Sequence, residues 1–183
     1  MKIMQIRNGM VTEQSYESLP TDIREELDRA IPEEGDTWPY FHREMGIVGY
    51  SDTQKEDEKL LLFSYDRNGT CTLHGSGLCV HEHLIIPAYA PTGDEVVGVD
   101  PLTLYMDSDV RSITFLGPET HIGYSAFQGC TRLEQVTFCG DVILHDTTAL
   151  QDCPCLRRVN IWGSVIPFAD PQSSAPTDYV PEW

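Results

Sequence analysis

Apolar residues recur with a fixed period in the second half of the chain. Three segments share one pattern, with apolar residues at the first, fourth and sixth places and glycine at the eighth, and they span residues 110–117, 133–140 and 156–163. Each begins 23 residues after the one before it. Short alternating segments predict strands, and a unit repeated at this interval predicts coils that stack on a common core. We therefore expect a solenoid whose strands form a parallel sheet, with places four and six pointing inward.

The segments between these strands keep the same register. Cys130 in the first clear unit recurs as Cys153 in the second. A more degenerate unit begins near residue 99 and has Asp107 at the corresponding place. Residues 84–87 (Leu-Ile-Ile-Pro) supply an earlier expected strand, so the solenoid begins before the clear repeats.

Glycine closes each of the three repeated strands, at Gly117, Gly140 and Gly163. A glycine at such a corner indicates either a left-handed turn or a close approach of two backbones, because a Cβ atom is disfavoured in both. The sequence leaves both explanations open.

The unit from His121 to Phe138 resembles the BspA-type leucine-rich repeat, which reads roughly I-G-x-x-A-F-x-x-C-x-x-L-x-x-V-x-I-P. The matching positions are Ile122, Gly123, Ala126, Phe127, Cys130, Leu133, Val136 and Phe138. The next unit departs from the pattern at His145-Asp146, where Ile-Gly is expected. The close resemblance covers residues 99–166, and a weaker one starts near residue 64. It implies a bacterial protein with a right-handed solenoid used for binding, and some members of the family are surface adhesins.

Residues 1–59 have a different pattern, which predicts a small hairpin and one helix. Alternating residues on either side of Asn8-Gly9 predict the hairpin. Apolar residues at helical spacing predict the helix, with Ser18 or Thr21 as its N-terminal cap and Pro32 after its end. The apolar stripe of this helix consists of Ile23, Leu27, Ala30 and Ile31.

The expected fold is a strand-dominated α/β repeat, a short right-handed leucine-rich-repeat solenoid with a parallel β-sheet and an N-terminal segment containing one helix. Its expected parts are an N-terminal capping segment (1–59), entry strands (60–98), 23-residue leucine-rich repeats (99–166) and a Pro-rich tail (167–183). The aromatic cluster at residues 38–41 is expected to cover the N-terminal end of the solenoid, or else to bind a partner. In the tail, Tyr179, Val180 and Trp183 are expected to dock back on the solenoid or to act as a linear motif.

Composition narrows the classes of partner. The chain has 29 acidic and 12 basic residues and a formal charge of −17, which argues against nucleic acid because phosphate binding needs clustered cations. The longest apolar run, residues 60–63, is too short for a membrane span of ~20 residues. No apolar segment of a signal peptide is visible near the N-terminus. We expect a cytoplasmic protein with mostly free thiols, or alternatively a secreted or surface protein exported by a route not visible in the sequence.

The outward places of the strands are the candidate partner-binding surface, because side chains alternate across a strand. The residues concerned are Leu116, Cys139, Trp162, Thr114, Thr137, Asn160, Gln135 and Arg158. The column Leu116, Cys139 and Trp162 is apolar on a face that should meet water. It is expected either to bind a protein partner or to be covered by the N-terminal segment or the tail.

No motif for catalysis stands out, and we expect neither an enzyme nor a cofactor. Cys79, His81 and His83 would share one side of a strand, with His74 nearby, but no second ligand pair completes a zinc site. The main hypothesis is a non-catalytic protein–protein interaction module that presents the strand face of the solenoid. A cell-surface adhesion or host-interaction protein is the alternative, and a metal site or enzyme around these histidines is a third possibility. A homodimer through an open end of the solenoid is also considered.

Overall fold

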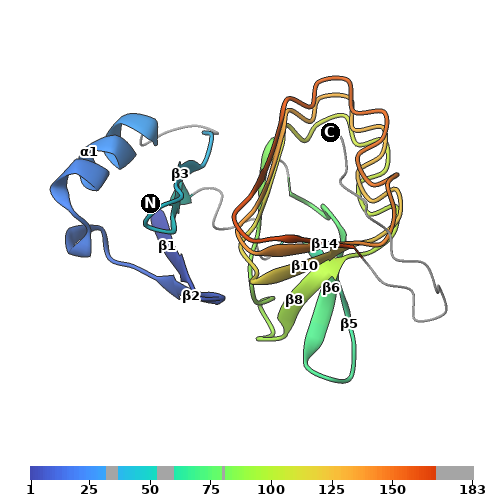
Figure 1. The fold of residues 1–183 in the computed structure, drawn as a ribbon, viewed down its shortest axis with the longest axis horizontal. Helices are drawn as coiled ribbons and strands as arrows, with labels where there is room; N and C mark the ends of the chain where they lie inside the picture. Colours follow the sequence, from blue (N-terminus) through green and yellow to red (C-terminus); the bar gives the residue numbers. More distant parts are fainter. Residues whose placement is uncertain (32–36, 53–59, 80, 168–183) are drawn as a thin grey trace.

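The computed structural model describes residues 1–31, 37–52, 60–79 and 81–167. The chain is dominated by strands and has two parts, which lie side by side in Figure 1. Residues 1–31 and 37–52 form a small antiparallel sheet with the α-helix, which we call the N-terminal module. Residues 60–79 and 81–167 form a β-solenoid of about four stacked turns. The expected docking of Tyr179, Val180 and Trp183 lies outside the described residues.

The N-terminal module begins with the predicted hairpin. Strands β1 (Lys2–Arg7) and β2 (Met10–Glu13) pair antiparallel. Asn8 and Gly9 join them with φ angles of 51° and 76°, the left-handed conformations that a two-residue hairpin turn requires. Strands β3 (Tyr40–His42) and β4 (Ile47–Tyr50) complete a sheet in the order β2-β1-β4-β3.

The predicted helix is confirmed as α1 (Thr21–Ala30), preceded by a short 3₁₀ turn, η1 (Tyr16–Ser18). Ile23, Leu27 and Ile31 pack against β1 and β4 and are buried, whereas Ala30 is exposed. The predicted cap is wrong, because Pro20 occupies the N-cap position and no side chain caps the helix. The Ser18 hydroxyl instead donates a hydrogen bond to the Ser15 carbonyl.

The 23-residue period is confirmed by the register of a parallel sheet. Strands β7 (His83–Ile86), β9 (Ser112–Phe115), β11 (Gln135–Phe138) and β13 (Arg158–Ile161) lie in chain order across it. Ile113, Val136 and Val159 are direct neighbours on successive strands. Their inward side chains stack in the same core, as the repeat predicts.

A second sheet, which the repeat did not predict, closes the other side of each turn. It contains β6 (Thr70–Gly75), β8 (Glu95–Val99), β10 (Glu119–Ile122), β12 (Asp141–Leu144) and β14 (Val165–Pro167), all parallel, with β5 (Leu62–Tyr65) antiparallel at its edge. Phe115, Phe127 and Phe138 fill the space between the two sheets. Pro167 therefore belongs to the last strand rather than to the tail.

The corner glycines resolve the choice that the sequence left open. None of Gly117, Gly140 and Gly163 has a positive φ angle. A Cβ atom on Gly140 would lie 2.1 Å from the carbonyl oxygen of Pro118 in the previous turn. Glycine is needed at this corner because two backbones approach closely.

Candidate protein-binding groove beside the strand face

The N-terminal module lies against the outer face of the β7–β13 sheet, beside the stack of turns (Figure 1). Ile6, Val48 and Tyr50 of the module form one buried cluster with Ile85, Leu116 and Cys139 of the sheet. Leu116 is 1% exposed and Cys139 is 5% exposed. Most of the apolar column is therefore in contact with the chain's own N-terminal module.

Aromatic residues of the module contact this face of the solenoid. Trp38 lies against His83 with ring centroids 4.3 Å apart, and the guanidinium of Arg111 is 5.4 Å from the centre of the Trp38 ring. Phe41 meets Trp162 edge-on, with centroids 6.2 Å apart. Both contacts help to hold the module against the solenoid.

The N-terminal module covers the outward side chains of the first repeat fully and those of the last repeat only in part. In the first complete repeat all three outward side chains, Ser112, Thr114 and Leu116, are buried. In the last repeat Arg158 is exposed, while Asn160 and Trp162 are half-buried. Of the eight candidate residues, Leu116, Cys139, Thr114 and Thr137 are buried, and the surface open to a partner lies toward β13.

A groove of about 570 Å³ runs along this open part and is called the strand-edge groove below. Five candidate residues line it together with two residues of the module and two inward residues of β13. The lining residues are Phe41, Arg43, Gln135, Thr137, Arg158, Val159, Asn160, Ile161 and Trp162. Because side chains from both faces of β13 contribute, the groove follows the edge of that strand as well as its face.

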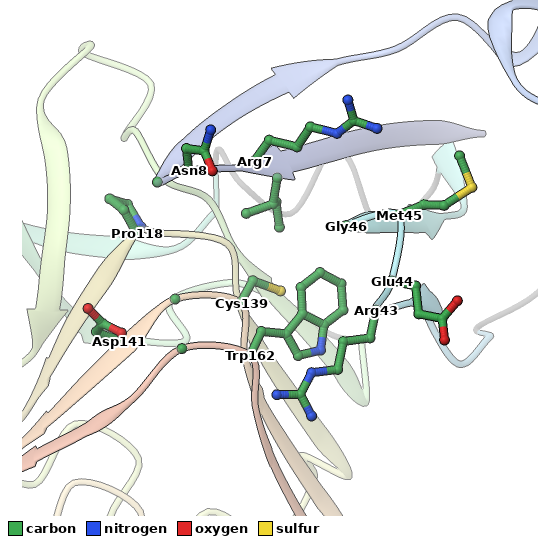
Figure 2. Close-up of a pocket in the computed structure, with 14 residues that line it drawn as sticks. Arg7, Asn8, Arg43, Glu44, Met45, Gly46, Pro118, Cys139, Asp141 and Trp162 are labelled. Atoms are coloured by element: carbon green, nitrogen blue, oxygen red, sulfur yellow. The ribbon is translucent and has the colours of Figure 1, made fainter.

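Two further hollows continue the groove. A cleft of about 440 Å³ shares Arg43 and Trp162 with it and extends between the turns of the module and the corners of the coils. Figure 2 shows Cys139 and Trp162 projecting from the solenoid toward the module at this cleft. A hollow of about 310 Å³ shares Gln135 and Arg158 with the groove on its other side.

The floor of the groove contains a short polar ladder across two strands. The amides of Gln135 and Asn160 each donate to the Thr137 hydroxyl, with nitrogen–oxygen distances of 3.2 Å in both cases. On the next strand the Thr114 hydroxyl is buried, and no described residue forms a hydrogen bond with it. The ladder fixes two amide side chains in position beside Arg158.

Cationic charge is concentrated here although the chain is strongly acidic. Arg43, Arg157 and Arg158 are exposed, and no ion pair or hydrogen bond of their side chains exists within the described part of the chain. Among the residues that the structure describes, the strand-edge groove is lined by two of these arginines and by no carboxylate. Its local charge is therefore positive.

The neighbouring arginines are, by contrast, already paired. Arg111 donates to Glu134 at 2.7 and 2.9 Å and lies 3.4 Å from Glu82, which also accepts from Arg132 at 2.8 Å. The hydrogen bond from Arg132 holds the pKa of the Glu82 carboxyl below its ordinary value, which keeps it charged. The positive charges of this network are therefore balanced by its own carboxylates.

The four residues of the metal hypothesis are not brought together as one site. His74 lies on β6 of one sheet, 3.0 Å from Asp100, whereas His83 begins β7 of the other. The His83 ring is buried and lies 2.8 Å from the Ser112 hydroxyl. Cys79 packs against the solenoid core, and Cys79 and His81 precede β7. Within the described ranges, no group of three or more His, Cys, Asp or Glu side chains is placed to hold a metal ion.

Cys139 is enclosed at the interface between module and solenoid, and burial raises the pKa of its thiol. Because alkylation requires the thiolate, we expect iodoacetamide at pH 8 to modify the exposed Cys155 quickly and Cys139 only after denaturation. Peptide mass mapping over time measures both rates. Equal rates at the two cysteines would mean that the module leaves the strand face readily in solution.

The module wall of the groove, formed by Phe41 and Arg43, was not predicted from the sequence. The signal that hinted at a covering was the change in the outward columns along the stack. The third position of the repeated segment is Ser112 in the first repeat, Gln135 in the second and Arg158 in the third. The side chain at this position therefore becomes longer and more polar toward the repeat that the module does not cover.

No family model, curated protein or solved structure matches the chain. Within the residues that the structure describes, no helix has the length and apolar character needed to cross a membrane.

Proposed function

We propose that the protein is a non-catalytic protein-binding module that uses the open part of the strand face of a leucine-rich-repeat solenoid of the BspA type. The observation that supports this most directly is the strand-edge groove, which gathers five of the candidate residues. A half-buried tryptophan lies beside fixed amides and beside arginines that no other described residue pairs with. This is the composition of an interface centre, where Trp and Arg are enriched.

The fixed geometry of the groove also favours binding. Two amides are held by the Thr137 hydroxyl, and Trp162 is supported edge-on by Phe41. Side chains that are ordered before binding lose less conformational entropy when a partner arrives. This preorganisation suits recognition of a partner.

Replacing Trp162 by alanine is expected to weaken a partner's affinity at least about a hundredfold, which corresponds to a central interface residue. The partner is first identified by cross-linking to the wild-type chain, and its affinity is then measured by calorimetry. Tyr124→Ala is the matched control, because Tyr124 is 52% exposed and lies away from the groove. Circular dichroism establishes that both variants are folded. Unchanged affinity in a folded Trp162→Ala variant would contradict the proposal.

A further inference from the structure

One edge of the β7–β13 sheet ends in the strand-edge groove. Within the described residues β13 pairs with β11 alone, so its other side has no strand partner. Backbone N–H and C=O groups along such an edge are ready to accept another strand. The groove that follows this edge is lined by every residue from Arg158 to Trp162.

The charge along this edge is positive. Arg158 lies on the strand itself, Arg43 on the opposite wall and Arg157 in the adjoining hollow. None of the three side chains is neutralised by another described residue. Because exposed charges are screened over about 8 Å at physiological salt, a short segment in the groove senses these arginines more than the distant acidic surface.

Resting on the proposed function, we infer that the partner supplies an extended acidic segment that adds as a further strand beside β13. Side chains of an added strand alternate between the two faces of the sheet. On the outer face they meet Arg158 and Trp162, where carboxylates and an aromatic group fit. On the inner face they meet the partly buried Val159 and Ile161, where apolar side chains fit.

The expected recognition element is thus a peptide in which acidic and apolar residues alternate. A long phosphate polymer fits less well, because beyond the groove it would run over the surface of a chain with a formal charge of −17. Main-chain hydrogen bonds to β13 would give affinity, and the arginines would give charge selectivity.

The test uses the full chain and a fluorescein-labelled nine-residue peptide of alternating glutamate and valine, followed by anisotropy. A lysine–valine peptide of the same length tests charge selectivity and is expected to bind at least about tenfold more weakly. The glutamate–valine peptide N-methylated at alternate amides tests main-chain hydrogen bonding, and it is also expected to bind at least about tenfold more weakly. Equal or tighter binding of the lysine peptide, no loss on N-methylation, or tighter binding of an oligothymidylate would each overturn the inference.

Charge reversal in the protein tests the same contact from the other side. Arg158→Glu and Arg43→Glu are each expected to weaken the glutamate peptide by about tenfold, and the difference should shrink at high salt. Arg67→Glu is the matched control, since Arg67 is exposed in the turn between β5 and β6, and it should change the affinity less than about twofold. Equal effects of all three reversals would assign the response to net charge and overturn the inference.

These outcomes separate the inference from the proposed function. Suppose that the cross-linked partner binds more weakly to Trp162→Ala but binds Arg158→Glu and Arg43→Glu as tightly as the wild type. The proposed binding function would then stand, and the inference of an acidic added strand would be refuted. A partner that is insensitive to Trp162 would refute the proposed function itself.

Discussion

Replacing Gly140 by alanine is expected to destabilise the protein by at least about 3 kcal/mol, which is a large part of the stability of an ordinary domain. The added Cβ would lie 2.1 Å from the carbonyl oxygen of Pro118 and 2.5 Å from that of Gly117. Both obstacles are backbone atoms of the preceding turn, so no side-chain rotation relieves the overlap. The two coils would have to separate at this corner, which disturbs the pairing of β10 with β12.

Gly117→Ala is the control, because Gly117 occupies the same corner one turn earlier. A Cβ there would meet its nearest heavy atom, the Val96 carbonyl oxygen, at 3.3 Å. The expected loss is below about 1 kcal/mol, since small adjustments accommodate such a contact. Urea denaturation followed by circular dichroism measures both variants. Similar midpoints for the two would contradict the close approach described at Gly140.

Replacing Leu116 by aspartate is expected to cost about 3–5 kcal/mol at the contact between module and solenoid. Leu116 is 1% exposed and packs in a cluster of apolar side chains from both parts. A carboxylate in that cluster would lose its hydration without gaining a cation, and the module would leave the strand face.

The signature is a tryptophan emission that shifts to the red under conditions where circular dichroism still reports strands. Trp38 and Trp162 both contact groups across the interface, so they become hydrated when the module detaches. Leu78→Asp is the control, because Leu78 is 77% exposed. A Leu116→Asp variant with the wild-type urea midpoint and emission would show that this contact contributes little.

Much of the fold could be predicted because its signals are local and periodic. The 23-residue interval fixes which strands are neighbours, and the pairing of Val136 with Val159 follows from it directly. The hairpin at Asn8-Gly9 and the stripe through Ile23 and Leu27 are likewise contained in a few consecutive residues. Each of these predictions rests on residues whose spacing alone determines their relative position.

The second sheet was missed because its strands do not share a repeated apolar pattern like that of β9, β11 and β13. In β10 only Thr120 and Ile122 are buried, and one of the two is polar. The module wall of the groove was missed for another reason. Arg43 and Trp162 are far apart in the chain. The sequence repeat indicates which solenoid strands are neighbours, but it does not indicate where the antiparallel sheet of the module contacts the solenoid. The packing of the module against the solenoid depends on the complementarity of two folded surfaces, which cannot be inferred from a single sequence.

The N-terminal module has a fixed width, whereas the solenoid is assembled from interchangeable units. Duplicating residues 118–140 would insert one more turn of 23 residues in register. The module could not widen to shield it, so the whole outward side of the new turn would be left open. Growth by duplication would thus enlarge the recognition surface of this architecture without altering the part that anchors it.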